Sequence, residues 1–205
     1  MSLQNRTRRT KRRIPKTVIC IGGMTGSGKS SVARRLAAEY GLQYFSGGDA
    51  LKALATEIGY KVAGKGWWEG KEGMRFLQQR TKEDKFDKEV DRRLLELAKQ
   101  GYVILDSWTM PWLLKDKSFK IWLEASVPMR AERVAERDGV GLVTALATLK
   151  EKDEKTRAIY KKLYGFELGI DFSPFDLVLD SSNLSADEVF RILSLVLKRF
   201  LFGID

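Results

Sequence analysis

Five short runs of apolar residues recur along the chain, and longer segments with apolar residues at helical spacing separate them. The runs are rich in β-branched and aromatic residues and too short to be helices, so each predicts a buried strand. Strands that alternate with helices are typical of a parallel sheet whose right-handed crossovers place helices on both faces. The strands are expected over residues 17–21, 42–45, 102–106, 119–123 and 175–179.

The segments between these runs have apolar residues every three to four positions, which is the spacing of amphipathic helices. Glycines follow several of these segments, as they do at helix ends, and residues 185–188 form a capping box ahead of the last one. The pattern therefore predicts an α/β fold, a five-stranded parallel sheet covered by helices on both faces. The helices are expected after residue 30 as far as Gly41, over 85–100, from Pro128 to Gly139, over 142–164 and after residue 185.

The first expected strand runs into a glycine-rich segment, residues 23–30, that fits the phosphate-binding pattern G-x-x-x-x-G-K-[ST]. In this pattern a tight turn aims backbone N–H groups and a helix N-terminus at one phosphate. Lys29 is then expected to reach the β- and γ-phosphates of ATP, and Ser30 to ligate Mg²⁺. The alternative, a glycine-rich turn with a surface lysine, is disfavoured because a strand precedes the pattern and a helix follows it. The nucleotide-binding residues expected in this phosphate loop are Gly23, Met24, Thr25, Gly26, Ser27, Gly28, Lys29, Ser30 and Ser31.

Acidic residues lie where the second and third expected strands end, at the sheet edge where open α/β folds bind ligands. Asp106 ends the third strand and is expected to hold Mg²⁺ together with Ser30, directly or through water. Asp49 and Lys52 follow the second strand and are candidates for substrate binding. The structural alternatives are Asp49 as a helix N-cap beside an exposed Lys52, and Asp106 as the cap of the next turn.

Two further segments have compositions that indicate a role. Residues 64–73 combine several glycines with Trp67 and Trp68, so we expect a mobile stretch in which the tryptophans either stack on a base or seal a loop against the core. Residues 129–165 are rich in cations and form either a solvated helical hairpin or a lid that closes over phosphates. The cations of interest in this lid are Arg133, Arg137, Lys152 and Arg157.

The net charge of +10 is concentrated at one end of the chain. Seven of the 37 lysines and arginines lie in residues 1–16 without an acid, which leaves 30 basic and 27 acidic residues elsewhere. This basic tail is a candidate segment for binding nucleic acid or a plain solvated extension. The single cysteine, Cys20, lies in an expected strand, which indicates a buried thiol and a reducing compartment. With no histidine and no apolar run long enough for a membrane, we expect a cytoplasmic protein without His-based acid–base chemistry.

Taken in order, these features resemble the nucleoside monophosphate kinase family, and within it the cytidylate kinases of archaeal type, from Val18 to about Leu197. The phosphate loop is strongly specific, whereas the other segments agree by order and spacing. The resemblance implies a P-loop NTPase fold over residues 17–205 behind the tail at 1–16, with an acceptor-binding insert at 49–100 and the lid at 129–165. The further matching segments are 46–49, 87–93, 120–123, 132–137, 150–153 with Arg157, 164–165 and 176–180.

The resemblance also implies an activity, the Mg²⁺-dependent transfer of the γ-phosphoryl group of ATP to a nucleoside monophosphate, above all CMP or dCMP. Lys29, Lys152 and Arg157 would then be catalytic, and Arg133 or Arg137 would lie beside the adenine. The acceptor would be bound by Asp49, Lys52, Arg92, Arg93 and Trp108.

Four positions depart from the family pattern. Trp108 stands where the family has an arginine that holds the acceptor, and Lys52, Lys152 and Ile159 also replace arginines. A lysine is a point charge without the planar fork of arginine, so phosphate binding survives whereas geometric selection of the acceptor weakens. We therefore keep two alternatives, a phosphate-loop kinase with another small acceptor and an RNA-associated ATPase that uses the basic tail. The expected assembly is a monomer.

Overall fold

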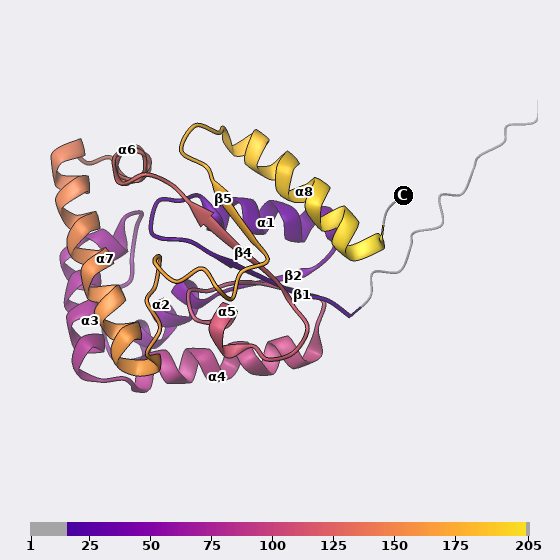
Figure 1. Cartoon of the computed structure of the whole chain (residues 1–205). Helices are drawn as coiled ribbons and strands as arrows, with labels where there is room; N and C mark the ends of the chain where they lie inside the picture. The colour runs from indigo at the N-terminus through magenta and orange to yellow at the C-terminus, as the bar shows by residue number, and fades with distance from the viewer. Residues whose placement is uncertain (1–15, 204–205) are drawn as a thin grey trace, which may run out of the picture.

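The computed structural model describes residues 16–203, and the basic tail expected at residues 1–16 lies outside this range except for Lys16. Five parallel strands form one sheet in the order β2-β3-β1-β4-β5 (Figure 1). Each expected strand is present, and its ends differ from the expected ones by no more than two residues. The strands are β1 (Val18–Gly22), β2 (Gln43–Ser46), β3 (Val103–Asp106), β4 (Phe119–Glu124) and β5 (Leu177–Asp180).

Helices cover both faces of the sheet because side chains alternate along each strand. In β1, Ile19 and Ile21 face one core, which α1 (Lys29–Tyr40) and α8 (Ala186–Phe202) complete. Cys20 faces the opposite core, which α2 (Gly47–Glu57), α4 (Lys85–Gln100) and α5 (Met110–Leu113) complete. The expected buried thiol is confirmed, and burial raises the pKa of Cys20 to about 12.

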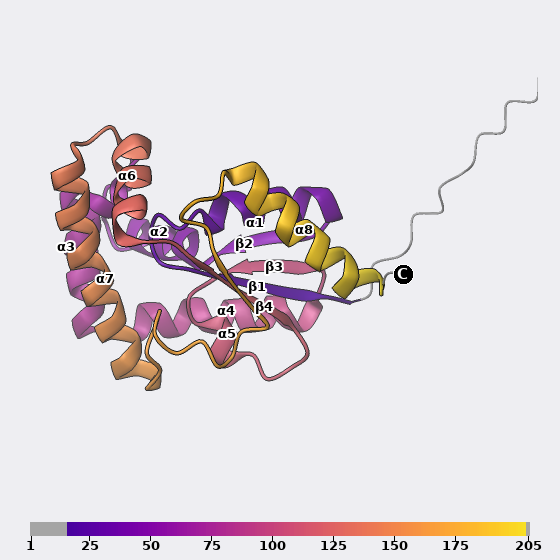
Figure 2. The ribbon, with the colours of Figure 1, turned by 45° about the horizontal axis from the view of Figure 1, so that its top comes forward.

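Three helices gather at the end of the sheet where the strands terminate, α3 (Lys71–Lys82), α6 (Val127–Asp138) and α7 (Leu142–Tyr164) (Figures 1 and 2). The bounds expected for α4 and α7 are confirmed. The capping box of α8 is also present, since Ser185 Oγ accepts from the N–H of Glu188 at 3.2 Å and the carboxylate of Glu188 accepts from the N–H of Ser185 at 2.8 Å. None of the helices within residues 16–203 is long and apolar enough to cross a membrane.

The expectation of a mobile stretch at residues 64–73 is wrong. The chain forms a 3₁₀ turn, η1 (Trp67–Glu69), and then enters α3. Trp67 fixes this turn because its indole is buried against Phe76, with ring centroids 6.1 Å apart, and its Nε1 donates to the carbonyl of Lys61 at 2.9 Å. Tertiary packing of one aromatic ring therefore overrides the local flexibility of the glycines.

The strand register brings three chain segments to the same sheet edge. Ile21 of β1 pairs with Asp106 of β3, and Ser46 of β2 pairs with the same aspartate from the other side. The segments that follow these residues are the phosphate loop, the start of α2 and the start of α5. The sheet thus places residues far apart in the sequence around one opening.

The close packing of α3 on η1 gives a test of this turn. A Cβ at Gly73 would lie 2.1 Å from the carbonyl oxygen of Trp67, so Gly73→Ala must displace backbone. We expect it to lower the free energy of unfolding by about 2 kcal/mol, although alanine is the better helix former by about 1 kcal/mol. Gly48→Ala in α2 is the control, because its nearest neighbour is 3.5 Å away. The melting temperatures of both variants are measured by thermal unfolding, with circular dichroism as the signal. Equal melting temperatures would contradict this packing.

Candidate active site

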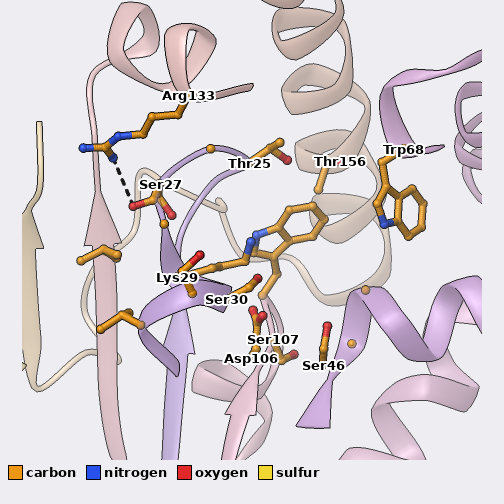
Figure 3. Close-up of a pocket in the computed structure, with 18 of the residues that line it drawn as sticks. Thr25, Ser27, Lys29, Ser30, Ser46, Trp68, Asp106, Ser107, Arg133 and Thr156 are labelled. Carbon is orange, nitrogen blue, oxygen red and sulfur yellow. Dashed lines mark hydrogen bonds between the residues drawn. The ribbon is translucent and has the colours of Figure 1, made fainter. Parts of the chain in front are cut away.

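A cavity of about 830 Å³ opens at the carboxyl edge of the sheet. Its walls come from the phosphate loop, the starts of α1 and α2, the inner face of α4, the β3–α5 connection and the lid helices α6 and α7 (Figure 3). The cavity therefore joins the nucleotide-binding loop to the segment expected to bind the acceptor and to the lid. Its volume is of the size that small-molecule sites occupy.

The phosphate loop has the backbone shape that the sequence pattern predicts. Gly26 has φ +82°, and a Cβ there would lie 2.6 Å from the carbonyl oxygen of Arg130. Glycine is required at this position both for its positive φ and for its close approach to α6. Lys29 and Ser30 open α1 directly after the loop, so their side chains and the helix N-terminus face the same cavity (Figure 3).

Side chains from other elements hold three carbonyl oxygens of the phosphate loop, and one of these carbonyls, that of Ser27, also accepts from Ser181 Oγ at 3.3 Å. Trp108 Nε1 donates to Gly23 at 2.6 Å, Arg130 Nη1 donates to Thr25 at 3.0 Å, and Arg133 Nη1 donates to Ser27 at 3.3 Å. Because these carbonyls are held by donors outside the loop, the backbone of the loop is fixed in place, and within it the N–H of Ser27 donates to the carbonyl of Met24 at 3.1 Å. The last of these bonds is drawn in Figure 3.

Arg130 is a structural residue whose part in the site was missed in the sequence. Its side chain is buried, and besides Thr25 it donates to the carbonyl of Ala125 at 3.2 Å and to Asp153 at 2.7 Å. A buried ion pair is tolerable because the guanidinium is so fully hydrogen-bonded. The pair joins α6 to α7 across 23 residues, and no local spacing reveals it.

The two expected Mg²⁺ ligands, Ser30 and Asp106, both line the cavity, and Figure 3 places them on the same side of it. Asp106 is buried and is not a cap, because Ser107 caps the next turn and Asp106 Oδ2 accepts from the hydroxyl of Tyr44 at 2.9 Å. Burial and the neighbouring carboxylate raise the pKa of Tyr44, so the phenol stays a donor. No cluster of three acidic, histidine or cysteine ligands exists among residues 16–203.

The expected acceptor residues divide into two groups. Asp49, Lys52 and Trp108 line the cavity, and Ser46 rather than Asp49 caps α2. The assignment of Arg92 and Arg93 to the acceptor is wrong in position, because both lie on the exposed face of α4 and pair with Glu89. The phase of the helix turns these two arginines away from the sheet edge.

Instead, α4 presents two carboxylates to the cavity, Asp87 and Asp91, which lie four residues apart on its inner face. Asp87 accepts from Nε and Nη2 of the buried Arg80 at 3.0 and 2.6 Å. Asp91 accepts from the hydroxyls of Thr109 and Tyr164, yet burial raises its pKa to about 6. The signal was present in the sequence, since both aspartates share the helical face that carries Val90 and Leu94.

Three of the four cations expected in residues 129–165 line the cavity, Arg133, Arg137 and Lys152. Lys152 and Arg137 both pair with Glu69, at 2.7 and 3.0 Å. Burial lowers the pKa of Lys152 to about 8. Arg157 lies outside this cavity, because its Nε donates to the carbonyl of Leu168 at 3.1 Å, so the expectation that it closes over the phosphates does not hold in this structure.

Tryptophans and unpaired hydroxyls complete the wall. Trp67 packs in the core, as the second alternative for this pair predicts, whereas Trp68 lines the cavity, and its stacking on a base stays a prediction. The ring of Trp108 lies 5.5 Å from Nζ of Lys29. The hydroxyls of Ser27 and Thr156, both in the cavity wall, are buried without a hydrogen-bond partner among the described residues. Such unpaired groups indicate a site that awaits a polar ligand.

The sheet order, the phosphate loop and the lid helices define the protein as a P-loop kinase by fold. Shikimate kinase from Acinetobacter baumannii superposes with a TM-score of 0.53 over 90% of this chain and 95% of its own, at 19% identity. A gluconokinase from Sinorhizobium meliloti superposes with a TM-score of 0.53 over 94% of this chain and 97% of its own, at 17% identity. At such identities the likeness concerns the fold, and the α/β fold expected from the sequence is confirmed.

The sequence gives the narrower assignment. A profile of the cytidylate kinase-like family matches residues 18–183, and the chain belongs to this family. A cytidylate kinase from Pyrococcus horikoshii is 33% identical over 87% of this chain and 86% of its own, and one from Aeropyrum pernix is 36% identical over 84% and 94%. The resemblance inferred from the motifs is therefore confirmed, and the protein is a phosphotransferase.

The raised pKa of Asp91 gives a test of the acceptor side. Between about pH 4 and 6 the carboxyl of Asp91 keeps its proton in the folded protein but has released it in the unfolded chain. The stability that follows from this difference in protonation is fully present below pH 4 and is lost as the pH rises through 6. Asp91→Asn should remove this loss. Its stability relative to wild type should rise by roughly 2 kcal/mol between pH 4 and 7, measured by urea unfolding.

Asp84→Asn is the matched control for this titration. Asp84 is the N-cap residue directly before α4, and its pKa is lowered by the bond from Lys88, so its removal should change stability with the opposite sign in acid. A pH-independent difference between Asp91→Asn and wild type would show that Asp91 does not titrate in this range.

Proposed function

We propose that the protein transfers the γ-phosphoryl group of ATP to CMP or dCMP in a Mg²⁺-dependent reaction. The observation that carries the proposal is the phosphate loop at the end of β1, whose Lys29 and Ser30 open onto the same cavity as Lys52 and Lys152. Membership of the cytidylate kinase-like family supports the choice of acceptor. Phosphoryl transfer in P-loop kinases requires positioning and charge neutralisation rather than covalent chemistry, and this cavity is built to supply both.

The donor half of the site is assigned to the loop and its neighbours. Backbone N–H groups of the loop and the ammonium of Lys29 hold the β- and γ-phosphates. Ser30 and Asp106 hold Mg²⁺, which supplies neutralisation of charge on these phosphates when bound. Arg133 lies between the loop and the β5–α8 connection, where it donates to the carbonyl of Ser181 at 2.7 Å. We assign the adenine to this side of the loop, flanked by Arg133.

The acceptor half lies on the other side of Trp108. Lys52 and Lys152 are the cations available to an acceptor phosphate, and Trp68 and Tyr160 supply flat apolar surface for a base. Trp108 cannot hold a phosphate by a bidentate fork. Its ring lies beside Lys29 and its indole nitrogen is bound to the loop, so its role is to exclude water from the point of transfer.

A second candidate is a kinase whose acceptor lacks a phosphate group. Several charges around the acceptor half are already paired with one another, Arg80 with Asp87 and Lys152 with Glu69. Of Arg80, Lys152 and Lys52, only Lys52 has no ion-pair partner among the described residues. A dianionic acceptor therefore meets less unpaired positive charge than a nucleotide kinase offers with several arginines. This arrangement favours small hydroxyl acceptors as the alternative.

ATP consumption in the presence of Mg²⁺ separates the two candidates. The acceptor panel contains CMP, dCMP, UMP, AMP and GMP beside unphosphorylated nucleosides and other small hydroxyl compounds. We expect a strong rise with CMP or dCMP. Turnover restricted to an unphosphorylated acceptor would overturn the cytidylate assignment in favour of the second candidate.

Lys29→Ala tests the donor half. Loss of the cation that faces the β- and γ-phosphates should lower turnover by about 10³-fold or more, whereas the melting temperature should stay within about 2 °C of wild type because Lys29 forms no ion pair among the described residues that the substitution would break. Lys155→Ala is the control, since Lys155 lies on α7 and pairs with Glu151 at the surface. A folded Lys29→Ala variant with turnover close to that of wild type would refute the assignment.

A further inference from the structure

We propose that Glu69 is a positioning residue that holds the lid cations Lys152 and Arg137 on the cavity wall for phosphoryl transfer. The proposal rests on the proposed function, because it assigns those cations to the transferring phosphoryl group. It concerns the turn η1, which lies in the glycine-rich stretch between α2 and α3. None of the roles assigned to the phosphate loop or to the acceptor residues uses this carboxylate.

Glu69 binds both cations at once. Its Oε1 accepts from Nζ of Lys152 at 2.7 Å, and its Oε2 lies 3.0 Å from Nη2 of Arg137. The side chains of Glu69 and Lys152 are only 9% and 6% exposed. Two buried charges in contact are held in a defined geometry, because separating them would leave each charge desolvated without a partner.

Glu69 is placed so that it supports the two cations without obstructing the cavity. Lys152, Arg137 and Trp68 line the cavity, whereas Glu69 does not. The carboxylate therefore lies behind the cations and does not occupy the space of a phosphate. Arg137 also pairs with Asp138 at 2.6 Å, so Glu69 shares Arg137 with that aspartate and is itself the carboxylate partner of Lys152.

The turn that carries Glu69 is itself firmly placed. Trp67 anchors it in the core, and the absence of a side chain at Gly73 lets α3 pack on its backbone. Trp68 adds a second contact, since Nζ of Lys152 lies 5.4 Å from the centre of its ring. Trp67, Trp68 and Gly73 together thus fix the carboxylate of Glu69 beneath the lid.

The charge state of Lys152 depends on this contact. The groups that act on its ammonium are Glu69 on η1, Lys29 in the phosphate loop and Arg137 on α6. Burial and the two other cations disfavour the ammonium form, and Glu69 favours it. Without the carboxylate, Lys152 would lose its proton at a lower pH and could no longer neutralise a phosphate near pH 8.

The test is the titration of Lys152 in wild type and in Glu69→Gln, which keeps the shape of the side chain but removes its charge. Nuclear magnetic resonance of the lysine side chain, assigned with Lys152→Arg, follows the titration without any acceptor. We expect a midpoint near pH 8 in wild type and about one pH unit lower in Glu69→Gln, since removal of a buried partner charge shifts a pKa by at least that much.

Kinetics provide the second readout. The alkaline limb of kcat should move to lower pH in Glu69→Gln, and kcat at pH 8 should fall about fivefold, because a pKa that drops from about 8 to about 7 lowers the charged fraction of Lys152 from about one half to about one tenth. Affinity for ATP should change by less than about threefold, because the phosphate loop binds the donor. Glu69→Asp, which keeps the charge, should restore part of kcat and lie between the other two in titration midpoint.

Glu72→Gln is the control, because Glu72 lies on the next turn of the chain and pairs only with the exposed Arg75 among the described residues. An unchanged midpoint and pH profile in Glu69→Gln, even with a lower melting temperature, would overturn the proposal and leave Glu69 a structural residue. If Glu69→Gln does not fold, Glu69→Asp decides by the same criteria. Failure of wild type to phosphorylate CMP would refute the proposed function instead, and the titration would still decide on Glu69.

Discussion

Three backbone carbonyls of the phosphate loop are held by side chains from outside the loop, and these bonds fix the position of the loop at the sheet edge. Trp108 comes from the β3–α5 connection, and Arg130 and Arg133 come from α6, so the loop is braced by two segments far from it in sequence. The sheet register makes this possible, because it ends β1 and β3 side by side. With its carbonyls fixed, the loop offers its N–H groups to phosphate without reorganisation, which is the condition for efficient charge stabilisation.

The same arrangement explains how a tryptophan can replace an arginine at the centre of the site. Trp108 gives up the forked contact to the acceptor but gains a bond to the loop and covers the side of Lys29. The positive charge on the acceptor side then comes from lysines. One of them, Lys152, is buried and needs a carboxylate partner to stay charged near neutral pH. We propose that the ring of Trp108, the lysines and the carboxylate of Glu69 together take the place of the arginines that the family pattern implies.

The sequence predicted those parts of the structure that local patterns determine. The strands follow from short apolar runs, α4 and α7 from long periodic segments, and the phosphate loop from a specific motif. The errors concern contacts between distant segments. The turn at Trp67 looked mobile because its glycines are visible locally, whereas the packing of its indole on Phe76 is not. The bond from Arg157 to Leu168 and the pair formed by Lys152 and Glu69 could not be predicted for the same reason. The inward orientation of Asp87 and Asp91, by contrast, follows from the helical spacing of α4 and could have been predicted.

The central claim is that this cavity passes the γ-phosphoryl group of ATP directly to a cytidine nucleotide. The most direct measurement incubates the full chain with Mg²⁺, CMP and ATP labelled at the γ-phosphate, and separates the products. The account predicts that the label appears in the β-phosphate of CDP, with little inorganic phosphate, because Trp108 keeps water from the site of transfer. Label found only in inorganic phosphate, or retained in ATP, would contradict it.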